Sequence, residues 1–121
     1  MSSTSRIIRL TFLGGTLGTA ARFTLSLTLG DVPSIIFVNL LGAALLGWFN
    51  GNTKNDTDDF NTFWKVGFTG GFTTMSAFAS FSVLYMQVLG IWAALATVAI
   101  SALGLGAYAL AFNIAKKKAR A

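Results

Sequence analysis

The feature that most limits how this chain can fold is a set of four long apolar segments, which fill most of its 121 residues. They run over about residues 7–29, 34–49, 63–89 and 91–115, and a polar loop covers residues 50–62. A helix needs roughly 20 mainly apolar residues to cross a bilayer. A soluble domain this short cannot bury a composition that is 54% hydrophobic. The sequence therefore predicts one all-α domain, residues 1–121, with four membrane-spanning helices.

The charged residues exclude several classes of function. All four acidic residues lie between the apolar segments, and the chain has no histidine and no cysteine. Acid–base or thiol catalysis needs such groups at a site, so an enzyme is not expected. Proton-coupled exporters need a titratable group at depth, which leaves a four-helix exporter of small molecules as a weaker alternative. The basic residues gather at segment ends, as membrane topology requires, so nucleic-acid binding is not expected either.

The third segment contains an unusual interruption, GFTGGFTTMSAFASF over residues 67–81. Three glycines precede a run of hydroxyl side chains, and both kinds of residue weaken a helix. Irregular backbone at membrane depth persists only where protein or a water-filled path satisfies its polar groups. Broken helices of this kind often form ion sites in transport proteins. The sequence thus predicts that the third helix is broken and forms the functional part of the chain.

Small and polar residues mark the faces that pack inside the bundle. Gly14 and Gly18 share one helical stripe with Arg22, a spacing that lets helices approach closely. A cation within a span faces protein or water, or extends to the interface, and both remain open for Arg22. Asn39 either joins helices by hydrogen bonds or lines a polar path. The last segment has one polar and small face, which is expected to look inward: Thr97, Ser101, Gly104 and Tyr108.

The groups left at membrane depth are hydroxyls, one amide, aromatic ring edges and backbone dipoles. Most of these donate hydrogen bonds or present a positive edge. A path lined in this way suits a small anion better than a cation.

Three motifs now point to a known family. GGTLGTAAR at 14–22, VNLLG at 38–42 and GFTGGFTTMSAF at 67–78 resemble the signatures of the Fluc, or CrcB-type, fluoride channels. The third motif is the specific one, and the order and spacing agree over nearly the whole chain. The resemblance implies an antiparallel, dual-topology dimer of four-helix subunits. It also implies fluoride pores at the subunit interface and a central structural Na⁺.

The resemblance also implies roles for individual residues. The backbone carbonyls of Gly70 and Thr73 would hold the Na⁺, and Arg22 would lie in a vestibule or have a structural role. Met75 stands where the family has a phenylalanine, and Ala77 where it has a hydroxyl. The anion pathway would be lined by six residues: Asn39, Met75, Ser76, Phe78, Ser101 and Tyr108.

The distribution of basic residues predicts the orientation in the plasma membrane. Four spans place both termini and the 50–62 loop on one side, with eight of the nine basic residues. Positive residues stay in the cytoplasm, so both termini are expected there. A single orientation favours a heterodimer with an oppositely oriented homologous subunit over a homodimer. A non-conducting accessory subunit is the alternative. The basic tail KKKAR is a topology anchor or a contact for anionic lipid.

Overall fold

The computed structural model describes residues 3–52 and 57–120, and this part of the chain is almost entirely helical, without a strand. The third membrane segment, Asp58–Leu89, consists of four consecutive pieces, two of them only three and four residues long. The prediction of an all-α fold is confirmed. In chain order the elements are α1 (Ser3–Leu29), α2 (Asp31–Gly51), α3 (Asp58–Phe60), the π-helix η2 (Asn61–Phe68), α4 (Thr69–Phe72), α5 (Met75–Leu89) and α6 (Ile91–Arg120).

Two single glycines make the sharp reversals between long helices. Gly30 joins α1 to α2 with a φ of 87°, and Gly90 joins α5 to α6 with a φ of 63°. Positive φ is costly for residues with a Cβ, so glycine is the residue that permits these turns. Pro33 lies in the first turn of α2, where its missing N–H leaves no hydrogen bond unmade. Gly30 alone separates the two helices, because Asp31 already begins α2.

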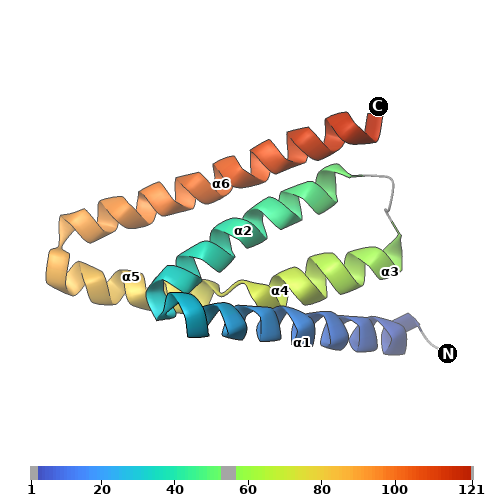
Figure 1. Cartoon of the computed structure of the whole chain (residues 1–121), viewed down its shortest axis with the longest axis horizontal. Helices are drawn as coiled ribbons and strands as arrows, with labels where there is room; N and C mark the ends of the chain where they lie inside the picture. Colours follow the sequence, from blue (N-terminus) through green and yellow to red (C-terminus); the bar gives the residue numbers. More distant parts are fainter. Residues whose placement is uncertain (1–2, 53–56, 121) are drawn as a thin grey trace.

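Both termini lie at the same end of the molecule as the end of α2 and the start of α3, and the two glycine reversals lie toward the other end (Figure 1). The arrangement agrees with the alternation of direction expected for four consecutive spans. Lys54 and Asp56, which the sequence places in the polar loop, lie outside the described residues.

The polar loop is shorter than predicted. A loop over residues 50–62 was wrong at both ends, because α2 continues to Gly51 and helix resumes at Asp58. Asn50 Nδ2 donates a hydrogen bond to Tyr108 Oη at 2.8 Å, which fixes the end of α2 against α6. At the other end, Thr57 Oγ1 accepts a hydrogen bond from the Phe60 N–H at 3.1 Å and caps α3.

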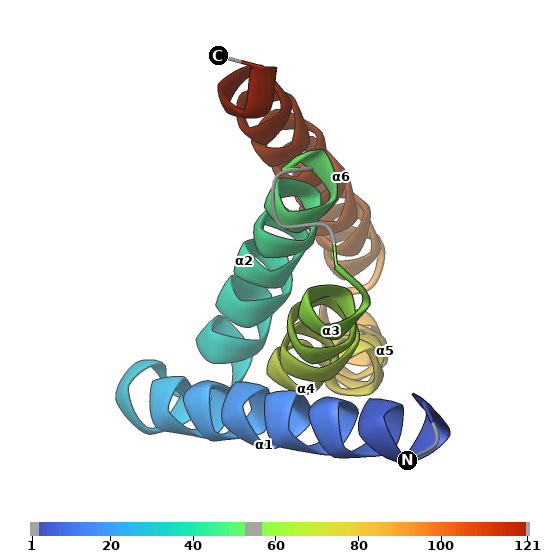
Figure 2. The same cartoon turned by 90° about the vertical axis from the view of Figure 1, so that its right-hand side faces the viewer.

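Glycines set the close approaches between helices. A Cβ added at Gly14 or Gly18 would overlap the backbone of the third segment, and one added at Gly47 would overlap the Tyr108 carbonyl group of α6. The interpretation of the α1 stripe as a packing face is confirmed. In Figure 2, α1 runs across the bottom of the view, with the third segment above it and α2 and α6 side by side.

The exterior of the described part is apolar and its interior is small. Its buried hydrophobic residues are Val38, Phe72, Ala93 and Ala115, whereas many leucines, isoleucines and phenylalanines are exposed. Within the described residues, three stretches are long and apolar enough to cross a membrane: Asp31–Gly51, Asp58–Leu89 and Ile91–Ala119. The chain is therefore a multi-pass membrane protein. The helix α1 is also long enough to cross a membrane, with 27 residues, but it is more polar than these three stretches. Its role as a membrane span therefore stays a prediction.

Candidate functional site

The third membrane segment is broken at two residues. The helix α4 ends at Phe72, and α5 begins at Met75. Between them, Thr73 has φ −94° and ψ 159°, and Thr74 has φ −146° and ψ 101°, which is extended backbone. The predicted broken third helix is confirmed, and the break falls within the predicted glycine-hydroxyl stretch.

Asn39 of α2 is bonded to the break by both ends of its amide. Its Oδ1 accepts a hydrogen bond from the Thr74 N–H at 2.8 Å, and its Nδ2 donates to the Thr74 carbonyl at 3.1 Å. The Thr74 hydroxyl in turn accepts from the Ala77 N–H at 3.3 Å, which caps α5. Of the two interpretations left open for Asn39, the helix-joining one is confirmed.

These hydrogen bonds change the environment of two backbone carbonyl groups. In a continuous α-helix, the Thr74 N–H would donate to the Gly70 carbonyl, and the Ala77 N–H would donate to the Thr73 carbonyl. Both donors are directed to side-chain oxygens instead. Gly70 is exposed, and a Cβ built on it would meet nothing within 4 Å. The two carbonyls that the resemblance assigned to Na⁺ are thus among those released from the helical pattern.

A cavity of about 420 Å³ lies between α2, α5 and α6, and Asn39 and Tyr108 contribute polar groups to its lining. Five of the six residues predicted for the anion pathway line it. Their roles as pathway residues stay a prediction, but the fold does bring them together from three helices. The five are Asn39, Met75, Phe78, Ser101 and Tyr108.

Ser76 is the predicted pathway residue that does not line this cavity. It is exposed, one position after Met75 on α5, and successive residues of an α-helix point about 100° apart. On α6, Ser101, Gly104 and Tyr108 line the 420 Å³ cavity. Thr97 lines a second cavity of about 240 Å³ between α2, α5 and α6. Residues of the face predicted to look inward thus line two cavities, although Ser101 is exposed.

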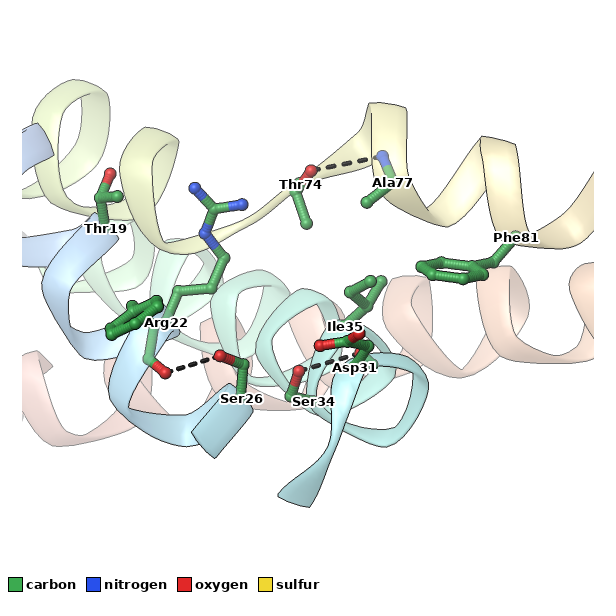
Figure 3. Close-up of a pocket in the computed structure, with 10 residues that line it drawn as sticks. Thr19, Arg22, Ser26, Asp31, Ser34, Ile35, Thr74, Ala77 and Phe81 are labelled. Carbon is green, nitrogen blue, oxygen red and sulfur yellow. Dashed lines mark hydrogen bonds between the residues drawn. The ribbon is translucent and has the colours of Figure 1, made fainter. Parts of the chain in front are cut away.

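Arg22 lines a third cavity, of about 400 Å³, beside the break. Its side chain is half-buried and extends from α1 toward the extended residues between α4 and α5 (Figure 3). It therefore extends toward protein, which agrees with the first of the alternatives left open for it. The polar groups around it were not predicted, although their helical spacing was a signal: Thr19, Ser26, Asp31, Ser34 and Thr74.

The sequence analysis also missed that the third segment begins as a π-helix. Thr69 Oγ1 donates to the Trp64 carbonyl at 2.8 Å, five residues back, and the Thr69 N–H bonds the same oxygen. A row of rings leads toward the break, with centroids 5.3 Å apart for Trp64 and Phe68, and 5.5 Å for Phe68 and Phe72. No single residue in this stretch predicts a π-helix, since aromatic residues pack equally well on an α-helix.

Comparison with known proteins gives a consistent match. The family model described as "CrcB-like protein, Camphor Resistance (CrcB)" matches residues 9–114. The "Fluoride-specific ion channel FluC" of Enterobacter sp. is 37% identical over 115 residues, which cover 84% of this chain and 87% of that protein. "Fluoride-specific ion channel FluC 1" of Corynebacterium glutamicum is 45% identical over 65 residues, 53% of this chain and 58% of that protein.

The extent of these matches differs between relatives. The match to "Fluoride-specific ion channel FluC 2" of Leifsonia xyli is 43% identical and covers 61% of this chain and 58% of that protein. The matched region thus spans under two thirds of the length of some relatives and most of the length of others. No solved structure matches the chain. Its relatives are ion channels, which confirms the prediction that it is not an enzyme. A family model that matches nearly the whole chain shows that this protein belongs to the CrcB family.

Proposed function

We propose that this chain is a subunit of a fluoride-specific channel that lets fluoride leave the cytoplasm passively and so reduces its toxicity. The observation that carries the proposal is the cavity beside the broken helix, where five of the six predicted pathway residues meet. The names of the relatives, fluoride-specific ion channels, support the choice of ion.

Fluoride is small and strongly hydrated, so a pore must replace its water with well-placed donors. The cavity offers three kinds. Asn39 Nδ2 carries two hydrogens, and the bond to the Thr74 carbonyl uses one. The Tyr108 hydroxyl accepts from Asn50, and its own hydrogen is left to donate. Ser101 adds a second hydroxyl, and the ring edge of Phe78 is electropositive.

Na⁺ is proposed as a structural ion at the break. Backbone carbonyls at the end of a broken helix are typical ligands for Na⁺ in transport proteins. Gly70 and Thr73 offer two such oxygens, whose helical donors are directed elsewhere. Two oxygens do not complete a shell, so the site would need the same two carbonyls from a partner subunit. We therefore propose that the ion lies at the dimer interface.

The proposed partner is an oppositely oriented homologous subunit, with the two chains antiparallel in the plasma membrane. The basic residues of this chain gather where its termini lie, which favours one orientation with both termini cytoplasmic. A relative from Corynebacterium glutamicum is named FluC 1 and one from Leifsonia xyli is named FluC 2, and such numbering supports pairing of two related chains. In this assembly α1 also crosses the membrane, beside the three more apolar stretches, and lipid covers the remaining apolar surface.

The exposure of α5 supports the same arrangement. Met75 is 73% exposed, and none of the α5 residues is buried. Ser76 lies on this open helix as well. A partner that covers α5 would place Ser76 at the interface and close the cavity on its open side.

A second candidate is a non-conducting accessory subunit, which supports a competent partner. It is favoured by the two departures from the family motif, Met75 and Ala77. Methionine fills the place of a phenylalanine but has no positive ring edge. Ala77 lines the Arg22 cavity, where a hydroxyl would add a donor.

Fluoride efflux from liposomes tests the proposal and separates the candidates. Liposomes with both chains should lose fluoride rapidly once a potassium ionophore lets K⁺ leave as well and so prevents a membrane potential from building up. They should retain chloride. The chain alone should give no efflux if it needs a partner. Efflux from the partner alone that equals the pair would identify an accessory subunit. Efflux no faster than from empty liposomes, with both chains present, would refute the channel.

A further inference from the structure

We infer that Asn39 is a positioning residue that creates the break in the third helix and so fixes the carbonyls of Gly70 and Thr73. The inference deepens the proposed function and rests on it only for the Na⁺ readout below. Asn39 is proposed above to line the anion path, and its bonds to Thr74 give it a second role that is independent of the first.

In an uninterrupted helix, the Thr74 N–H would donate to the Gly70 carbonyl, four residues back. Without a competing acceptor, that hydrogen bond would extend α4 through the break. Asn39 Oδ1 supplies the competing acceptor at 2.8 Å. A buried donor must be paired, so an acceptor from α2 is what allows Thr74 to leave the helix.

The side-chain amide of Asn39 also binds the carbonyl group of Thr74. Nδ2 donates to the Thr74 carbonyl at 3.1 Å, so Asn39 engages both polar groups of one residue, as a neighbouring strand does. The Thr74 backbone is therefore held extended, with φ −146° and ψ 101°. This orients its hydroxyl toward the Ala77 N–H, which is the donor that the Thr73 carbonyl loses.

Packing from the same helix supports this interpretation. A Cβ added at Gly42, one turn after Asn39 on α2, would overlap the methyl group of Thr73. The backbone of α2 thus approaches the break closely at one point and bonds to it at another. One face of α2 therefore fixes the position of the break, and Asn39 supplies its polar contact.

The test is the exchange rate of single backbone amides, measured by NMR on the full-length protein in its native assembly. Asn39→Ala should speed exchange of the Thr74 amide by about tenfold or more, since a hydrogen bond of ordinary strength is lost. Asn39→Asp keeps an oxygen in the same place, so it should retain the Thr74 protection that alanine loses. Asn50→Ala, on the same helix, removes the bond to Tyr108 and should leave Thr74 unchanged.

Three results would overturn the inference. One is unchanged Thr74 exchange in Asn39→Ala, and another is Asn39→Asp exchange as fast as that of alanine. The third needs no variant: a Thr74 amide in the unmodified protein that exchanges as fast as an unprotected one. The unmodified protein therefore decides the matter even if Asn39→Ala does not fold.

A second readout separates this inference from the proposed function. The unfolding temperature of the unmodified assembly should be higher in Na⁺ than in K⁺, and Asn39→Ala should lose the difference while Asn50→Ala keeps it. An unmodified protein that ignores Na⁺ would refute the proposed sodium site and leave the exchange result standing. An Asn39→Ala variant that keeps the full Na⁺ effect would refute the positioning of the carbonyls by Asn39.

Discussion

The two halves of the third membrane segment lie in opposite environments. Before the break, η2 and α4 pack against α1 so closely that Gly67 and Gly71 lie against its backbone. After the break, α5 has no buried residue and lines the cavities. The half before the break therefore anchors the segment to α1, whereas α5 stays exposed toward the cavities and toward the proposed partner. The break at Thr73 and Thr74 allows the two halves to serve these separate purposes.

The largest effect should come from adding a side chain where α1 packs against the half of the third segment that precedes the break. Gly18→Val would place a side chain against the Phe68 carbonyl of η2 and the backbone nitrogen of Phe72, the last residue of α4. We expect a loss of about 3 kcal/mol in the free energy of unfolding, because backbone has to move. Denaturant titration in detergent, followed by tryptophan fluorescence, measures it. Ala79→Val on exposed α5 is the matched control and should change stability by less than about 0.5 kcal/mol. Equal effects at both sites would remove the contrast between the halves.

The junction between the halves should show an intermediate effect. Thr74→Val removes the hydroxyl that caps α5 by accepting from the Ala77 N–H. Loss of a helix cap typically costs about 1 kcal/mol. The same titration measures this, and amide exchange at Ala77 should accelerate with it. Thr24→Val serves as control, because the Thr24 hydroxyl bonds only within α1, to the Ala20 carbonyl. Unchanged Ala77 exchange in Thr74→Val would contradict the cap.

A change on the cavity side of α6 tests the open half. Tyr108→Phe removes the acceptor of the Asn50 amide and should cost about 1 kcal/mol. Fluoride efflux should fall as well, since the hydroxyl is a proposed donor in the path. Tyr85→Phe is the matched control, on α5 at the far end, where Tyr85 is 45% exposed. Efflux that is unaffected in Tyr108→Phe, or equally reduced in Tyr85→Phe, would argue against Tyr108 as a pathway residue.

The smallest effect should have the opposite sign. Gly106 lies within α6, and a Cβ built on it meets nothing within 4 Å. Gly106→Ala should stabilise the protein by about 0.5 kcal/mol, because alanine favours helix more than glycine does. Unfolding measurements beside Gly18→Val would then show that only glycines at close approaches are required. A destabilised Gly106→Ala would mean that the assembled protein packs a neighbour against this site.

Much of this architecture could be predicted from sequence, because hydropathy and glycine spacing act locally. The spans, the turn at Gly30 and the glycine stripe of α1 follow from such signals. The break was predicted as well, but its mechanism was not, since Asn39 and Thr74 are 35 residues apart. The π-helix and the polar groups around Arg22 were missed for the same reason: they depend on how α1 meets the third segment. The length of the polar loop was wrong, because Asn50 pairs with Tyr108 across two helices.

The central claim is that fluoride passes the cavity beside the broken helix, and a single cysteine tests it most directly. The chain has no cysteine, so Ser101→Cys introduces the one reactive thiol of this subunit into the cavity. Ala99→Cys places one on an exposed position of α6 outside that cavity instead. Treatment with a bulky thiol reagent should at least halve fluoride efflux through liposomes that contain the Ser101→Cys assembly, and should spare Ala99→Cys. Efflux that persists at full rate after complete modification at position 101 would contradict the account.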